Sequence, residues 1–181
     1  IPALADTTQD DSIADMAERA LSLWDGMLVP VGLSMGGYVA MEMARRAPER
    51  MARIALLNTT CRIDSAAQRK QREQAIALAQ SDRFKGVTRH LLPRLLSPDA
   101  VNNPLIAGRV LKMAEDIGRQ TFSRQQMAIL GRQEQKDMLR AFHKPMLILC
   151  GTLDVLTPPK LSDEMVSLCP HADYRLLAGV G

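Results

Sequence analysis

Short apolar runs of strand length alternate with longer amphipathic stretches at the two ends of the chain. Apolar runs of this kind are typical of parallel strands that are buried on both faces, and apolar residues at every third or fourth position are typical of helices. The pattern predicts strands over residues 27–33, 53–58, 145–150 and 174–178. It predicts helices over residues 12–24, 35–46 and 157–169. Pro30 cannot donate to a ladder and makes the first half of its strand the weaker part.

The order of these elements indicates the fold class. Residues 27–58 show a strand, a glycine-rich turn, a helix and a second strand. This βαβ succession is typical of a parallel sheet with flanking helices. The 181 residues, 46% of them hydrophobic, are enough for one globular domain with a substantial core. Only 3% are aromatic while 11 are Met, so aliphatic and thioether side chains must fill that core.

The middle of the chain, residues 62–140, has a different pattern. Its charges are dense, it has no strand-like apolar run, and Pro93, Pro98 and Pro104 interrupt it. It predicts helices over residues 65–80, 83–92, 105–117 and 123–142. Because these helices are too long for one crossover, we expect a helical cap inserted into a core. The cap would comprise residues 62–140, and the core residues 1–61 and 141–181.

Charge follows the same division. Residues 62–140 contain 15 Lys or Arg and 8 Asp or Glu, although the net charge of the whole chain is only +3. A basic cap would favour an anionic substrate, and the alternative is a set of solvated helix faces. Met127 and Met138 could line an apolar pocket beneath the cap or pack inside it. We expect no nucleic-acid partner, since no basic run alternates with aromatic residues, and no membrane partner.

The sequence lacks the features that are typical of disulfide-rich, secreted and metal-binding proteins. Cys61, Cys150 and Cys169 are too few and too widely spaced for a disulfide framework, so we expect buried or free thiols. The first residues do not resemble a secretory signal, and we therefore expect a cytoplasmic protein. No Cys/His spacing indicates a metal, and no cofactor is expected. Asn58 begins a glycosylation sequon, which carries little weight without a secretory signal. The oligomeric state stays open.

The segment Gly32-Leu33-Ser34-Met35-Gly36-Gly37 lies where the first strand turns into a helix. A serine hydroxyl becomes a useful nucleophile when a sharp turn exposes and fixes it and a base accepts its proton. Glycines two residues before and after the serine relieve the crowding of such a turn, and the next glycine allows close packing of the helix on the sheet. The N–H of Met35 is placed to donate to an oxyanion. The alternative is an ordinary glycine-rich βα turn.

A carboxylate follows the third predicted strand. Gly151-Thr152-Leu153-Asp154 comes directly after residues 145–150, at the strand end where open α/β sheets bind ligands. Asp154 could orient a catalytic histidine, or it could only cap the loop.

Together these two segments resemble the α/β-hydrolase superfamily, in particular its capped serine-hydrolase branch of enol-lactonases, carboxylesterases and carbon–carbon bond hydrolases. The resemblance covers the chain from about Ser12 to its last residue, and Ala47-Pro48-Glu49-Arg50-Met51 adds weaker support. It implies Ser34 as nucleophile, Asp154 as triad acid and the Met35 N–H as one oxyanion donor. It also implies a histidine base on a loop after the last strand.

That base has no counterpart among the histidines present. We expect His90, His143 and His171 to be structural or surface residues, and we expect the base directly after Gly181. The family's first strands and its second oxyanion donor should precede Ile1. We therefore expect a chain that is truncated at both ends.

The leading function is hydrolysis of a carboxylic ester, lactone or thioester of a small acyl substrate through a Ser-His-Asp triad and an acyl-enzyme. One alternative is carbon–carbon bond hydrolysis of a diketone acid on the same triad, for which a basic cap would suit the carboxylates. Another is a hydrolase-fold protein that binds a small molecule or a partner without catalysis.

Overall fold

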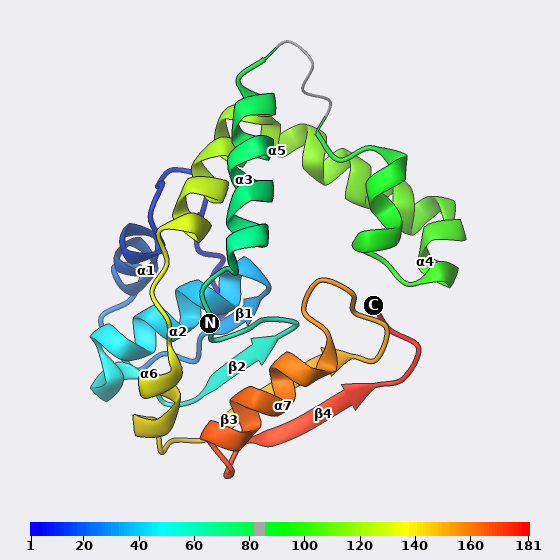
Figure 1. The fold of residues 1–181 in the computed structure, drawn as a ribbon. Coiled ribbons are helices and arrows are strands. Elements are labelled where there is room, and N and C mark those ends of the chain that lie inside the picture. Colours follow the sequence, from blue (N-terminus) through cyan, green and yellow to red (C-terminus); the bar gives the residue numbers. More distant parts are fainter. Residues whose placement is uncertain (82–85) are drawn as a thin grey trace.

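The sheet carries the candidate site at one edge. The computed structural model describes residues 1–81 and 86–181, and these form a sheet of four strands in the order β1-β2-β3-β4 (Figure 1). The strands are β1 (Val31–Leu33), β2 (Ile54–Leu57), β3 (Met146–Gly151) and β4 (Asp173–Leu177). Every neighbouring pair is parallel, which confirms the predicted α/β class. The residues that follow each strand therefore meet at the same edge.

The first strand is shorter than predicted. It begins at Val31 rather than at residue 27, because Pro30 has no N–H to donate. The Pro30 carbonyl still accepts a hydrogen bond from the Ala55 N–H at 2.9 Å. Before it, Leu28 and Met51 form an isolated parallel bridge. The prediction for the first half of this strand was therefore wrong.

Helices of the two chain ends cover the sheet. These are α1 (Ile13–Leu21), α2 (Met35–Arg46), α6 (Lys136–Ala141) and α7 (Pro159–Leu168), with the short 3-10 helix η1 (Pro48–Arg50). Helix α2 packs on β1 and β2, and α7 packs on β3. Helix α6 contacts both α2 and α7. Helix α1 packs against α2 from outside.

Only one face of the sheet is well buried. Ile54 and Ile148, which face the helices, are 1% and 0% exposed. On the opposite face, Val31 and Leu33 are 68% and 63% exposed. The prediction that the strands are buried on both faces is therefore wrong for the described residues.

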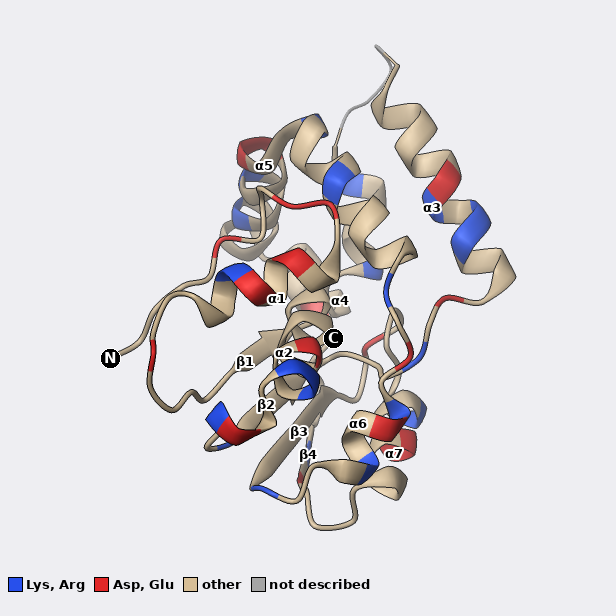
Figure 2. Ribbon diagram, turned by 90° about the vertical axis from the view of Figure 1, so that its left-hand side faces the viewer, with Lys and Arg blue, Asp and Glu red and all other residues tan. Residues whose placement is uncertain are grey.

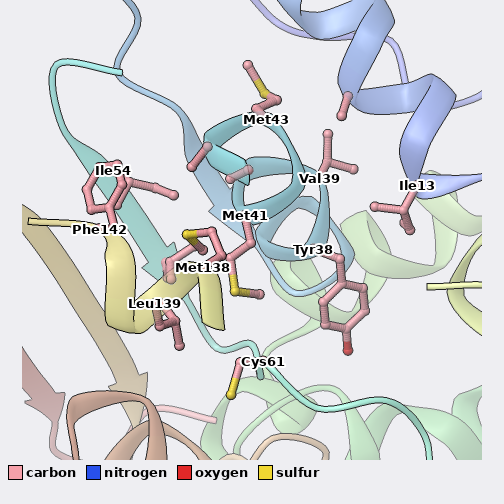
Figure 3. Packing of buried hydrophobic residues seen from close by; sticks show 14 of the residues in the cluster. Ile13, Tyr38, Val39, Met41, Met43, Ile54, Cys61, Met138, Leu139 and Phe142 are labelled. Atoms are coloured by element: carbon pink, nitrogen blue, oxygen red, sulfur yellow. The ribbon is translucent and has the colours of Figure 1, made fainter. Parts of the chain in front are cut away.

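Sulfur-containing and aliphatic side chains fill the core, as the composition predicted. Figure 3 shows Met41 of α2 and Met138 of α6 among the packed side chains, together with Ile54 of β2. Met138 is 7% exposed and belongs to this core, whereas Met127 is 40% exposed. Of the two methionines considered for a pocket, Met138 therefore packs inside the protein.

The first helix begins at the predicted place, with a serine cap, but ends early. The Ser12 side chain accepts the Asp15 N–H at 3.0 Å and begins the helix. The helix ends at Leu21 rather than at residue 24, and the Ser22 hydroxyl bonds the carbonyl of Arg19. Trp24, the last residue of the predicted helix, lies beyond the observed helix and is 57% exposed.

Helices occupy the described part of the chain between β2 and β3. Besides α6 they are α3 (Ala66–Ala79), η2 (Arg89–Arg94), α4 (Pro98–Asn102) and α5 (Pro104–Leu130). The capping box of Ser65 and Gln68 begins α3 within a residue of its predicted start. Residues 83–85 of the predicted helix 83–92 lie outside the described residues, and the described remainder includes the start of η2. The assignment of residues 62–140 to a separate cap domain stays a prediction.

Two glycines determine how the later helices divide. Gly118, at φ 70° and ψ 170°, interrupts α5 just after the predicted end of helix 105–117. Gly131 ends α5, so the continuous helix predicted over 123–142 was wrong. After it the Gln135 N–H donates to the Cys61 carbonyl at 2.8 Å, which turns the chain before α6 begins.

Strands β1 to β3 carry no charged residue, whereas β4 carries Asp173 and Arg175, and the other charged residues lie on helices and loops (Figure 2). Basic and acidic residues are mixed on α3 and α5 in the same view. The three cysteines are buried free thiols, as expected. Among the helices of the described residues, none combines the length and the apolar character that a membrane span requires.

Candidate active site

Ser34 forms a strained turn between β1 and α2. Its backbone has φ 52° and ψ −115°, a region that residues with a side chain rarely adopt. The Ser34 N–H donates to the Leu57 carbonyl at 2.9 Å. The Ser34 carbonyl accepts the Gly37 N–H at 2.9 Å and the Thr59 hydroxyl at 2.8 Å. The residue is exposed, so its hydroxyl stands at the surface of the edge.

Two of the three glycines in this turn have no room for a side chain. A Cβ on Gly32 would lie 2.2 Å from the Gly36 carbonyl oxygen, and a Cβ on Gly37 would lie 2.5 Å from Thr59 Oγ1. A Cβ on Gly36 would meet nothing within 4 Å. The structure thus agrees with the sequence interpretation for Gly32 and Gly37, whereas crowding does not explain Gly36.

Met35 is the first residue of α2 and is half-buried. The N–H groups of a helix's first turn have no acceptor within the helix, and they carry the positive end of the helix dipole. The Met35 N–H is therefore available at the turn where Ser34 is exposed.

Asp154 lies on the loop after β3, on the same edge of the sheet. Its Oδ1 accepts the N–H groups of Leu156 and Thr157, both at 2.8 Å. Its Oδ2 accepts the Thr157 hydroxyl at 2.7 Å and the Asn58 amide at 2.5 Å. These four hydrogen bonds come from the loop of Asp154 itself and from the segment after β2. The group is thus held in one orientation.

The same hydrogen bonds set the ionisation of Asp154. Burial on its own would raise the pKa of the carboxyl, because a charged group loses solvation. The donors from Asn58, Thr157 and Leu156 outweigh burial and hold the pKa below its usual value. Asp154 is therefore a carboxylate at neutral pH.

Asn58 and Thr59 are the site residues that sequence reasoning missed. They directly follow β2, which lies between β1 and β3 in the sheet. The reasoning that singled out Asp154, a polar residue just after a buried strand, applies equally to Asn58. In the sequence Asn58 was noted only as the start of a glycosylation sequon. In the structure its amide nitrogen donates to Asp154, and Thr60, the last residue of the sequon, is only 7% exposed.

Two of the three histidines lie at the opposite edge of the sheet from Ser34 and Asp154. His143 and His171 precede β3 and β4, with ring centroids 6.3 Å apart, so both lie at the amino ends of the strands. His90 lies in η2. Within residues 1–81 and 86–181, no hydrogen bond joins a histidine to Ser34 or Asp154. The same ranges hold no group of three or more His, Cys, Asp or Glu side chains that could bind a metal.

Comparison with known proteins identifies the family. The model of the alpha/beta hydrolase fold family matches residues 3–181. The chain belongs to this family. Its parallel sheet and its strand–serine–helix turn are thus features of an alpha/beta hydrolase.

The similar proteins include esterases. A pimeloyl-[acyl-carrier protein] methyl ester esterase of Neisseria meningitidis is 27% identical over 142 residues, which are 75% of this chain and 54% of the relative. The structure of a thermophilic esterase from Thermogutta terrifontis is 25% identical, with a TM-score of 0.88 over 100% of this chain and 66% of that one. An enol-lactonase from Burkholderia xenovorans is 25% identical, with a TM-score of 0.77 over 92% and 64%. The chain thus spans between half and two thirds of the length of these relatives.

Proposed function

We propose that the protein is a serine hydrolase that cleaves a carboxylic ester, lactone or thioester. The observation that carries the proposal is the backbone of Ser34, which is strained and exposed at the sheet edge that also holds the ionised Asp154. Strain of this kind persists where the surrounding structure enforces it, and it concentrates at functional sites. The names of the similar proteins support ester and lactone bonds as the substrate class.

Each residue has a distinct role in this proposal. Ser34 Oγ attacks the carbonyl carbon while a histidine takes the hydroxyl proton. The Met35 N–H donates to the oxyanion that forms. The histidine then gives its proton to the departing alcohol or thiol, which leaves an acyl group on Ser34. Water, deprotonated by the same histidine, attacks the acyl group and releases the acid. Asp154 holds the histidine in the required tautomer and stabilises its charged form.

The helices between β2 and β3 would form the cap over this site. Residues 62–140 are then the cap, and residues 1–61 and 141–181 belong to the core. The basic surplus of the cap favours an acyl substrate with a negative group.

The test is covalent labelling of the full-length protein with a fluorophosphonate, followed by peptide mass spectrometry. We expect one modified residue, Ser34, together with hydrolysis of p-nitrophenyl acetate, and loss of both in Ser34→Ala. Ser12→Ala, which changes a serine on a distant helix cap, is the matched control and should label normally. A folded protein that neither labels nor hydrolyses the ester would refute the proposal and favour a binding protein.

A further inference from the structure

We infer that the dipeptide Asn58-Thr59 sets the position of Asp154 relative to Ser34, with Thr59 holding the nucleophile turn and Asn58 holding the carboxylate. The inference rests on the proposed function of Ser34 and Asp154. It assigns Asn58 and Thr59 as positioning residues, which act through the two reacting groups and do not touch the substrate.

The place of the dipeptide in the sheet makes this possible. It follows β2, whose neighbours are β1, which leads to Ser34, and β3, which leads to Asp154. Backbone hydrogen bonds continue past the strand ends on both sides. The Ser34 N–H donates to Leu57, and the Asn58 N–H donates to Leu149, each at 2.9 Å. The middle strand therefore contacts both halves of the site.

Thr59 holds the turn by a hydrogen bond and by its bulk. It is 0% exposed, and its hydroxyl donates to the Ser34 carbonyl at 2.8 Å. Its side chain fills the space that a Cβ on Gly37 would need, with Thr59 Cβ 2.7 Å from that position. The carbonyl of the strained residue and the first turn of α2 are thus both fixed against Thr59.

Asn58 reaches the carboxylate from an unusual backbone conformation. Its φ is 44°, in the left-handed region that asparagine tolerates better than most residues with a side chain. From there its amide donates to Asp154 Oδ2 at 2.5 Å, across 96 positions of sequence.

The other donors to Asp154 do not make this link. The Leu156 and Thr157 groups are two and three residues away on the same loop. They orient the carboxylate within its loop, but they would move with the loop if it shifted. Among the hydrogen bonds of the described residues, the Asn58 amide is the one that ties the carboxylate to another strand. Loss of this amide should therefore leave both groups intact and disturb their relative position.

Two substitutions separate the amide from the backbone of residue 58. Asn58→Gly accepts a φ of 44° without strain and lacks the amide. Asn58→Asp keeps the shape and tolerates the conformation, but it replaces the donor with a carboxylate. We expect each to lower kcat/KM about 10- to 100-fold through kcat, since a shift of ~1 Å or less at reacting groups has effects of that size. A merely structural asparagine would give an Asn58→Gly enzyme that retains its activity.

At Thr59 the pair is valine and serine. Thr59→Val keeps the bulk and loses the hydroxyl, whereas Thr59→Ser keeps the donor. We expect Thr59→Val to lower kcat and the rate of fluorophosphonate labelling, and Thr59→Ser to restore most of both. Thr60→Val is the matched control, because the Thr60 hydroxyl accepts the Arg62 N–H and touches neither reacting group. It should retain wild-type activity.

A readout independent of activity separates this inference from the proposed function. Carbon NMR of the Asp154 carboxyl should show a higher pKa in Asn58→Gly, because a donor to the ionised form is gone, and a higher one still in Asn58→Asp. An unchanged carboxyl pKa, or unchanged kcat in an active enzyme, overturns the inference. If the wild type neither labels nor hydrolyses esters while the pKa moves as expected, the proposed function has failed, and the link from Asn58 to Asp154 stands as a structural one.

Discussion

Arg132→Met should strongly destabilise the protein, because Arg132 is the centre of a buried polar cluster. Its Nη2 lies 2.8 Å from Asp64 Oδ1, and the two side chains are 5% and 2% exposed. Its Nε and Nη1 donate to the carbonyls of Arg62 and Ile129 at 3.1 and 2.8 Å. The guanidinium carbon lies 4.4 Å from the centre of the Tyr38 ring. The cluster joins the segment after β2 to the end of α5.

The size of the expected loss of stability depends on the charge of Asp64, which stays buried when Arg132 is replaced. Methionine fills similar space, so the main loss is the charge and its hydrogen bonds. Removing one partner of a buried ion pair costs about 3–5 kcal/mol, because the other charge stays buried. Asp64 keeps a second partner, since Arg72 Nε lies 2.6 Å from its Oδ2. We therefore expect a loss of about 3 kcal/mol, at the lower end of this range.

Two matched variants calibrate the measurement. Arg72→Met removes the partly exposed partner of Asp64, at 25% side-chain exposure, and should cost about 1 kcal/mol. Arg140→Met removes an exposed ion pair with Asp137 and should change stability by no more than ~0.5 kcal/mol. The assay is urea unfolding at pH 7, monitored by circular dichroism, with comparison of midpoints at a constant m-value. An Arg132→Met variant that loses less than about 1 kcal/mol would show that the buried cluster does not depend on Arg132.

Three further predictions concern ionisation and backbone strain. Glu42 is 4% exposed, and hydrogen bonds from two arginines and a glutamine outweigh its burial and lower its pKa from 4.5 to about 2. Ionised Glu42 stabilises the folded protein by about 3 kcal/mol; this contribution is complete above pH ~4.5 and is lost as the pH falls towards 2. In Glu42→Gln the free energy of unfolding should therefore depend less on pH over that range. Gly32→Ala should cost about 3 kcal/mol or more, whereas Gly36→Ala should be neutral or stabilise by up to ~1 kcal/mol in urea unfolding. Ser34→Gly should stabilise the folded protein by about 1 kcal/mol, because glycine relieves backbone strain of about 1–3 kcal/mol at some entropic cost. Ser34→Ala keeps the strained backbone and should not stabilise the protein.

Local signals predicted the elements that have clear boundaries in sequence. Helix α2 was predicted at its observed limits, because the Gly-rich turn precedes it and Pro48 follows it. Helix α3 was predicted within one residue at each end, and the structure shows Ser65 as its cap. In both cases the residues that begin and end the helix act on their own neighbours, and no distant contact is needed to place them.

Two of the errors arose where distant contacts decide the structure. A helical pattern continues through residues 123–142, but Gly131 weakens it and Arg132 gains more from Asp64 than from a helix position. Nothing near residue 132 in sequence indicates that partner, which lies 68 positions away. The link from Asn58 to Asp154 was missed for the same reason, since the sequence predicts each strand but not which strands are neighbours.

The glycine contacts also refine what the serine motif requires. In Gly-x-Ser-x-Gly-Gly the sterically constrained positions are Gly32 and Gly37, while the glycine two residues after the serine has open space. Gly37 is constrained by Thr59, which also bonds the Ser34 carbonyl. A chance Gly-x-Ser-x-Gly run lacks such a partner, and the strain at its serine would then have nothing to enforce it. The combination that distinguishes a nucleophile turn here is therefore a glycine three residues after the serine together with a buried threonine after the adjacent strand.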